Sequence, residues 1–367
     1  MDRQKVNIKE HNLYLPDKYI HIPNKLGGMS VNDVVQVATE LSMHYIERVK
    51  GKDPYTFAYP RKLRKSKPDL NNGGFQYLWK AVPRLDKWCE ENVAGARVLT
   101  IYEPEKAILN DGEGLGEEGI RLLHKLPDAQ GVRRRKEYGI KWLNENIKGG
   151  ENILIAPSGN NIPYLEALSK LPEGHRPKHA VALDYSFKDL NKSKIIASDM
   201  GLEAEPIDYI WRNLKDKKGF TRRQLIAGII PKKVLGSVFM WQKRGEIRGD
   251  FDLKEGYFDI IKVDGWFEYW PDEKLANHLG EFLKLLKPGG KLIFDDVRGD
   301  KHPSPHFIRT TLGWIPYALR DVDRLHDNVL SRNADAIDTV DIHNVDNVFR
   351  MVEITKAESK VEIMMAA

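Results

Sequence analysis

Small polar residues follow the short apolar run at residues 152–156, where a ligand could bind. They are Pro157, Ser158, Gly159 and Asn160. Small residues in such a turn let a ligand approach the backbone closely. The helix predicted at residues 162–171 begins directly afterwards, and the N–H groups of its first turn can receive a carboxylate. This turn is therefore predicted to bind part of a cofactor.

Acidic residues follow the next apolar runs. Asp184, followed by Tyr185, ends one run, and its carboxylate can accept hydrogen bonds from both hydroxyls of a ribose. Asp208 lies near the end of another and is a candidate for contact with adenine, while Asp264 and Gly265 end a further run, where a transferring group would lie. In an open α/β sheet, ligands bind beyond the carboxyl ends of the strands, so we expect all of these residues at one cofactor site.

Further polar and aromatic residues are predicted at the same rim. Trp266, Tyr269 and Asp296 are candidates for the substrate pocket. His302 and His306 are candidate catalytic residues, because a histidine there can deprotonate a hydroxyl or an amine. The alternative is a surface loop with ordinary histidines. Together with Asp296 the two histidines do not have a diagnostic metal spacing, and no metal is expected.

These residues need a sheet to bring them together. From residue 149 onward, short apolar runs alternate with amphipathic segments, which predicts a mostly parallel sheet covered by helices on both faces. The predicted fold class is α/β, a Rossmann-like doubly wound sheet with an N-terminal helical region. Strands are predicted at 152–156, 179–184, 203–210, 258–264, 291–296 and 348–355, and helices at 162–171, 186–201 and 272–286, the last ended by the Pro-Gly-Gly at 288–290.

The first part of the chain has a different pattern. Residues 1–148 contain helical periodicity at 29–49, 75–92, 117–126 and 133–147, and Ser30 is a plausible N-cap. We predict a helical cap there that shapes an acceptor pocket or makes a homodimer. Residues 149–367 form the second predicted domain, with a helical insertion at about 212–256.

The stretch from Tyr257 to Val297 carries a family resemblance. It contains Tyr-Phe-Asp-Ile-Ile-Lys-Val-Asp-Gly-Trp, a helix, and Leu-Leu-Lys-Pro-Gly-Gly-Lys-Leu-Ile-Phe-Asp-Asp-Val. With Asp184 after Val-Ala-Leu, it resembles the class I S-adenosylmethionine-dependent methyltransferase superfamily over residues 149–356. The resemblance implies S-adenosyl-L-methionine as cofactor, Asp184 as the ribose-binding acid, and methyl transfer to oxygen or nitrogen of a small or medium-sized molecule.

The first turn departs from the family pattern, which is usually rich in glycine. Residues 156–161, Ala-Pro-Ser-Gly-Asn-Asn, contain one glycine, and Asn160 is expected to take a positive φ. The turn is also loosely similar to that of nicotianamine-synthase-like enzymes, which transfer an aminocarboxypropyl group. A third interpretation is a non-catalytic, methyltransferase-like binding or scaffold protein.

Composition and charge bear on the remaining questions of disulfides, cellular location and binding partners. A single cysteine, Cys89, excludes an intrachain disulfide and fits a reducing, cytoplasmic location. The net charge of +5 and the basic runs at 61–67 and 133–136 are expected to be solvated faces, so nucleic acid is not an expected partner. One arginine of the second run is a candidate to meet the cofactor's carboxylate. No run of 18 apolar residues or secretory signal is present, so no membrane partner is expected.

Overall fold

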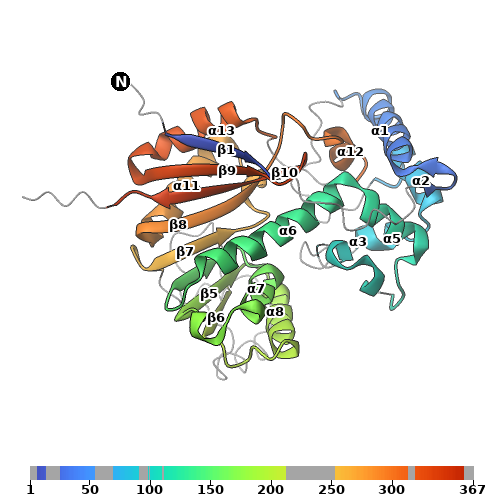
Figure 1. Cartoon of the computed structure of the whole chain (residues 1–367). Helices are drawn as coiled ribbons and strands as arrows, with labels where there is room; N and C mark the ends of the chain where they lie inside the picture. The colour runs from blue at the N-terminus through green and yellow to red at the C-terminus, as the bar shows by residue number, and fades with distance from the viewer. Residues whose placement is uncertain are drawn as a thin grey trace, which may run out of the picture.

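The computed structural model describes residues 6–13, 25–53, 69–90, 98, 100–109, 111–211, 253–312 and 319–358. The predicted insertion at 212–256 lies almost wholly outside these residues. The described residues form a large α/β part and a helical cap beside it (Figure 1). Among the helices described, none has the length and apolar character needed to span a membrane.

An eight-stranded sheet forms the α/β part, in the order β1-β9-β10-β8-β7-β4-β5-β6. All neighbouring strands are parallel except β10, which is antiparallel to both β8 and β9. The segment β6-β5-β4-β7-β8 follows the doubly wound order, with its switch point between β4 and β7. The predicted Rossmann-like α/β fold is confirmed. The strands are β1 Ile8–Asn12, β4 Asn152–Ile155, β5 His179–Asp184, β6 Ile207–Trp211, β7 Phe258–Val263, β8 Leu286–Val297, β9 Ile337–Asn344 and β10 Phe349–Lys356.

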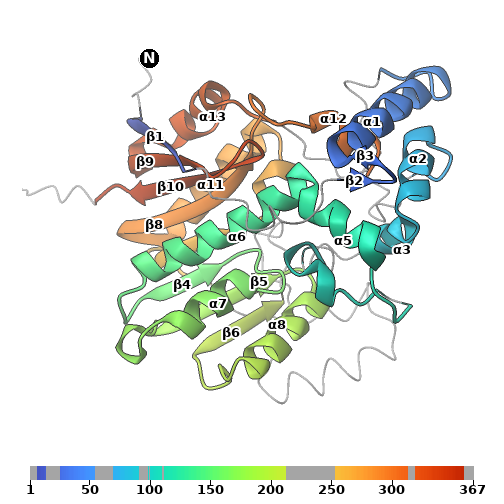
Figure 2. The ribbon, with the colours of Figure 1, turned by 45° about the vertical axis from the view of Figure 1, so that its right-hand side comes forward.

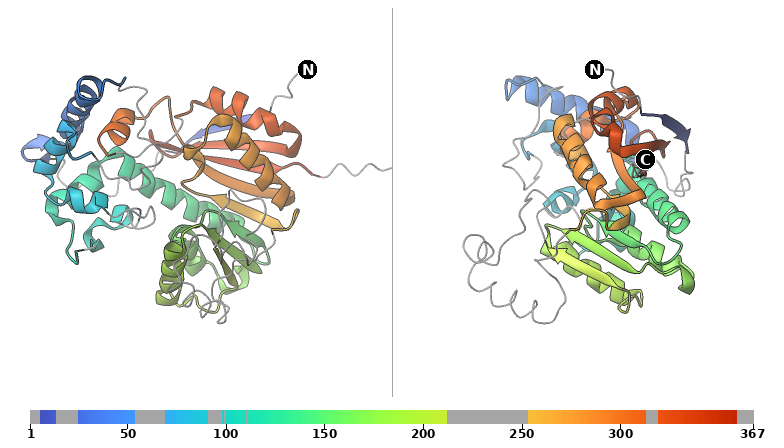
Figure 3. Two further views of the ribbon diagram at one scale, coloured as in Figure 1. Left: turned by 180° about the vertical axis from the view of Figure 1, so that it is seen from behind. Right: turned by 90° about the vertical axis from the view of Figure 1, so that its left-hand side faces the viewer.

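Helices cover both faces of the sheet, as Figures 1 and 3 show from front and back. On one face lie α6 (Pro127–Asn146), α7 (Ile162–Lys170) and α8 (Phe187–Asp199); on the other lie α11 (Asp272–Leu285) and α13 (Val322–Asn328). Successive side chains of a strand point to opposite faces. In β8, Ile293 therefore joins the core under α6, while Leu292 and Phe294 join the core under α11.

The cap faces the carboxyl ends of the parallel strands (Figures 1 and 2). It contains the short hairpin β2 (Lys25–Leu26) and β3 (Met29–Ser30), and helices α1 (Val31–Arg48), α2 (Gly73–Ala81), α3 (Leu85–Glu90) and α5 (Gly116–Lys125). Ser30 caps α1 as predicted, because its Oγ accepts a hydrogen bond from the N–H of Asp33 (3.1 Å).

The cap and the sheet do not divide at one point of the sequence. α12 (Pro305–Thr310), which lies between β8 and β9 in the chain, packs with the cap, and its Phe307 is fully buried there. Asn72, the N-cap of α2, donates from Nδ2 to the carbonyl of Thr310 (2.8 Å). In the other direction, β1 joins the edge of the large sheet beside β9. The predicted domain boundary between residues 148 and 149 therefore remains a prediction. The positions of α12 in the cap and of β1 in the sheet show that each part also contains a segment from the other side of that boundary.

We expect Gly74→Ala to destabilise the cap, because α1 and α2 are in contact at this glycine. A Cβ at Gly74 would collide with the carbonyl oxygen of Ala38 and with Oγ of Ser42. Overpacking of this kind costs about 1–3 kcal/mol. Gly73→Ala is the matched control, because a Cβ there meets nothing within 4 Å. Thermal unfolding should show a lower midpoint for Gly74→Ala alone; equal midpoints for the two variants would contradict the close helix contact.

Candidate functional site

The carboxylate of Asp184 ties together the ends of β4 and β5. Its Oδ2 accepts the N–H of Gly159 (2.8 Å), and its Oδ1 accepts the N–H of Ser186 (2.7 Å). The residue is only 3% exposed, and this burial raises the pKa of Asp184 to about 6, although the backbone hydrogen bonds act in the opposite direction. Each carboxylate oxygen can accept a second hydrogen bond, so the group can still receive two hydroxyls.

The turn after β4 holds buried polar atoms without partners. Oγ of Ser158 and both amide atoms of Asn161 are buried, and none of them makes a hydrogen bond within the described residues. Such atoms cost about 1–3 kcal/mol each unless a ligand or water meets them. The expected positive φ falls on Asn161 (φ 58°) and Gly159 (φ 51°), not on Asn160. Asn160 instead accepts the N–H of Ile162 on its own Oδ1 (3.3 Å).

A buried ion pair lies at the end of β7. The amine of Lys262, a residue that is 1% exposed, contacts Oδ2 of Asp264. Gly139 of α6 leaves the space for this amine, because a Cβ there would lie 3.2 Å from Nζ of Lys262. The other oxygen of Asp264, Oδ1, is buried without a hydrogen-bond partner in the described part of the chain. Sequence analysis missed Lys262; the signal was a lysine among the apolar residues 260–263 of a central strand.

A second buried network lies between α6, β7 and β8. Arg135 donates to Oδ2 of Asp295, and the N–H of Gly265 donates to the other oxygen of that carboxylate (2.7 Å). Glu268 is buried beside them; burial and the charge of Asp295 raise its pKa well above the ordinary value, while the charge of Arg135 opposes this shift. Of the basic run at 133–136, Arg135 is thus the residue that lies beside the predicted Gly265, and its partner there is Asp295.

The prediction for Asp208 is wrong. Asp208 pairs with Val181 in the middle of β5, and its carboxylate contacts Nε2 of His179 (3.1 Å), the first residue of that strand. Its side chain is therefore directed toward the amino ends of the strands, away from the cofactor turn. Trp211 occupies the end of β6 beside Asp184, and its Nε1 donates to the carbonyl of Tyr185 (2.9 Å). The strand predicted from the sequence ended at residue 210, one residue too early, and Trp211 was therefore missed.

Asp296 is also misplaced by the sequence analysis. Because Asp295 and Asp296 are consecutive in β8, they point to opposite faces. Asp296 is fully buried on the α11 face, where its Oδ1 accepts from Nη1 of Arg320 (2.9 Å) and its Oδ2 lies 3.6 Å from Nε of Arg350. It is part of a structural ion pair and does not line a substrate pocket.

The aromatic residues after β7 serve mainly to pack α11. The ring of Trp266 lies 4.7 Å from that of His278 and 6.0 Å from that of Phe282, measured between centroids. Trp266 therefore packs against α11 and is partly buried, and its place in a substrate pocket remains a prediction. Tyr269 is partly buried in the short helix η3 (Phe267–Tyr269), and its place in a pocket remains a prediction.

The two predicted catalytic histidines differ in their surroundings. Nε2 of His302 lies 3.0 Å from Oδ1 of Asp128, and its Nδ1 accepts the N–H of Ser304 (3.1 Å). The side chain of His302 is fully buried, and neither its Nε2 nor Oδ1 of Asp128 has a hydrogen-bond partner among the described residues, so His302 is enclosed where its loop meets the start of α6. His306 on α12 is partly exposed, and burial together with the charge of Arg309 lowers its pKa. His306 therefore remains the candidate base.

No family model matches the chain, and no curated protein sequence matches it. Among solved structures, one from Bordetella parapertussis, described as a possible exported protein, shares 14% identity with a TM-score of 0.55, over 90% of this chain and 97% of that one. That structure shows the same fold over nearly the whole chain.

Two further solved structures match a smaller share of the chain. Magnesium protoporphyrin IX methyltransferase from Synechocystis PCC 6803 gives 10% identity and a TM-score of 0.39, over 63% of this chain and 85% of that one. The 1,6-didemethyltoxoflavin-N1-methyltransferase of Burkholderia thailandensis gives 14% identity and a TM-score of 0.39, over 61% and 78%. Likeness at this level does not establish a shared activity.

Proposed function

We propose that this protein binds S-adenosyl-L-methionine at the carboxyl edge of β4, β5 and β7 and transfers its methyl group to a small or medium-sized molecule. One observation carries the proposal: unpartnered buried polar atoms gather around the first turn of a doubly wound sheet, next to the acid that ends the second strand. They belong to Ser158, Asn161 and Asp264. A switch point with these donors and acceptors suits a nucleoside that carries an amino-acid end.

Each residue of this edge has a role in the proposed site. Asp184 would accept the ribose hydroxyls on the second lone pair of each oxygen. The side chains of Ser158 and Asn161, with the Lys262–Asp264 pair, offer both donors and acceptors to the charged amino-acid end. Gly159 lets the backbone approach the ligand, because a Cβ there is both absent and, at φ 51°, disfavoured.

The cofactor, when bound, supplies a methyl group already activated on a sulfonium. The protein's own residues then have to align the acceptor and exclude water. The cap stands opposite this edge (Figure 2), and we propose that it helps to enclose the acceptor. His306, whose lowered pKa keeps it neutral at pH 7, would take a proton from an acceptor hydroxyl or amine.

Calorimetric titration with S-adenosylmethionine and S-adenosylhomocysteine tests the proposal. We expect binding in the micromolar range, which corresponds to about −8 kcal/mol. Absence of binding at millimolar cofactor would contradict it and favour the scaffold interpretation. Incubation with a panel of small hydroxyl and amine compounds then distinguishes the chemistry: methyl transfer releases S-adenosylhomocysteine, whereas transfer of an aminocarboxypropyl group releases 5′-methylthioadenosine.

A further inference from the structure

The segment that carries α12 leaves the sheet and returns to it at one place. Arg298 and Arg320 form an isolated parallel bridge, and the N–H of Gly299 donates to the carbonyl of Arg320 (2.6 Å). Between these two residues the chain runs out from the carboxyl end of β8 to the cap. α12 therefore lies between the proposed cofactor edge and α1 (Figures 1 and 2).

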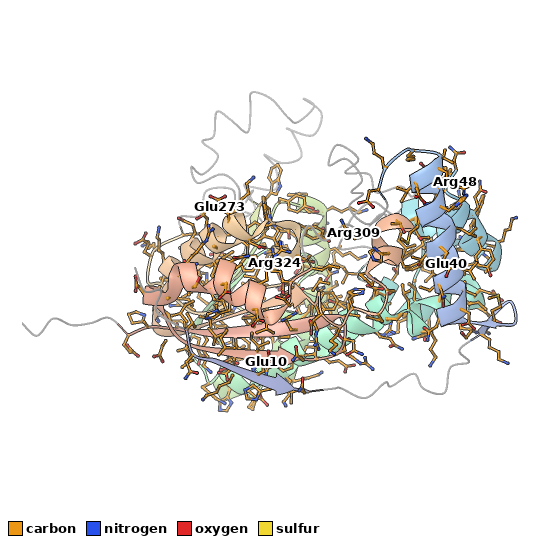
Figure 4. The ribbon with its side chains drawn as sticks, turned by 90° about the horizontal axis from the view of Figure 1, so that it is seen from above. Glu10, Glu40, Arg48, Glu273, Arg309 and Arg324 are labelled. Atoms are coloured by element: carbon orange, nitrogen blue, oxygen red, sulfur yellow. The ribbon has the colours of Figure 1, made fainter. Side chains whose placement is uncertain are left out.

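One face of α12 packs on the cap. Phe307, Thr310 and Thr311 are fully buried; Oγ1 of Thr311 lies 2.8 Å from Oγ of Ser42 on α1. At about 100° per residue, Arg309 projects from the side opposite Phe307. In Figure 4, Arg309 lies between α1 and the sheet, on the side of α12 away from α1.

Arg309 has no counter-ion in the described part of the chain. Its Nε is buried without a hydrogen-bond partner there, and no described carboxylate lies within ion-pair distance. Burial lowers its pKa from the ordinary value, and its titratable neighbour one turn earlier is His306, which also lies near His302. Arg309 is partly buried, and partial loss of hydration around a cation without a counter-ion favours the binding of an anion there.

We propose that the acceptor carries an anionic group, a carboxylate or a phosphate, which Arg309 binds. This inference rests on the proposed methyl transfer. The guanidinium presents its N–H donors in a fork that matches both kinds of anion. An anion held by Arg309 would place the rest of the acceptor between α12 and the ends of the strands, next to His306.

Anion-dependent thermal unfolding tests the inference without any need for turnover. Wild type, Arg309→Met, Arg309→Lys and the control Lys301→Met, which removes an exposed cation from the same segment, are compared in sodium phosphate, sodium benzoate and sodium chloride of equal ionic strength. We expect phosphate or benzoate to raise the midpoint of wild type and of Lys301→Met by about 2–4 °C above chloride. Arg309→Met should lose this rise, and Arg309→Lys should keep part of it.

The two anions separate the two sources of the charge. A rise with phosphate alone indicates a phosphorylated acceptor, and a rise with benzoate alone indicates a carboxylate. Equal midpoints of wild type in all three salts, or the same rise in Arg309→Met as in wild type, would overturn the inference. In chloride the unfolding midpoint of Arg309→Met should equal or exceed that of wild type, because a partly buried cation without a counter-ion has been removed. This comparison also shows whether the variant folds.

Cofactor titration keeps this result distinct from the proposed function. Arg309→Met should bind S-adenosylhomocysteine within about twofold of wild type, and lose about 100-fold in kcat/KM on acceptors that carry the anion, which is about 2.7 kcal/mol. If wild type binds no S-adenosylhomocysteine, the methyltransferase proposal fails whatever the anions do. If it binds, and neutral amides are methylated as well as the matching acids, the Arg309 inference alone fails.

Discussion

Asp184→Asn is expected to lower the affinity for S-adenosylhomocysteine by about 100-fold or more. The carboxylate already accepts the N–H groups of Gly159 and Ser186, and an amide can satisfy only one of them with its single oxygen. The amide NH₂ would then face a backbone donor and open the turn. Loss of hydrogen bonds to a charged acceptor, at about 1.5–3 kcal/mol each, gives the expected factor. Calorimetry measures it directly.

Asp199→Asn is the control for this variant, because Asp199 is an exposed acid at the end of α8. It should bind the cofactor as wild type does. Unchanged affinity in Asp184→Asn, with the control also unchanged, would remove Asp184 from the site and leave it as a purely structural link between β4 and β5.

The same carboxylate predicts a pH dependence. Since burial raises the pKa of Asp184 to about 6, the folded protein binds a proton more tightly than the unfolded chain does. The contribution of this group to stability therefore increases as pH falls from about 6 toward about 4. Cofactor binding needs the ionised form, so affinity for S-adenosylhomocysteine should fall roughly tenfold per pH unit below about 6. In Asp184→Asn the residual affinity should lack this slope.

Arg135→Met is expected to lower the free energy of unfolding by about 3–5 kcal/mol. Arg135 is the buried cation that compensates Asp295, whose side chain is 1% exposed, and it also lies against Glu268. Removing it leaves a carboxylate buried with only the N–H of Gly265 as a described donor. Denaturant unfolding gives the magnitude.

Lys141→Met tests the same kind of charge loss on the exposed side of α6. Lys141 is 60% exposed and lies 3.8 Å from Glu145, so its removal should change stability by only about 0.3–0.5 kcal/mol. The double variant Arg135→Met, Asp295→Asn should recover part of the loss, because the two residues are coupled. Additive losses in the double variant would show that the buried ion pair is not what stabilises this junction.

The α/β core was predictable from the sequence because its strands are buried on both faces. Runs such as residues 152–155 and 258–263 are mainly apolar, and the structure places both in the centre of the sheet. The two strands at the β1 end of the sheet lack that signal. β1 is Ile-Lys-Glu-His-Asn and largely exposed, and β9 alternates acids with apolar residues, so neither was predicted.

Residues of the candidate site that lie at the end of a strand could be predicted from the sequence. Residues whose role depends on the direction of the side chain were harder to predict. The turn at 157–160 and Asp184 were found together from strand ends, and the structure joins them through Gly159. The adjacent acids at 295 and 296 cannot be assigned to faces without the register of β8. His302 looked available because its partner, Asp128, lies on α6, 174 residues earlier in the chain.

The pairing of β1 with β9 imposes an order on the folding of this protein during its synthesis. His11 contacts Asp341 across 330 residues of sequence. At a synthesis rate of roughly 5–20 residues per second, the N-terminal strand waits on the order of tens of seconds before its partner leaves the ribosome. Until then the segment Ile8–Asn12 has no sheet to join, and its Lys, Glu, His and Asn side chains keep it hydrated and away from other strand edges.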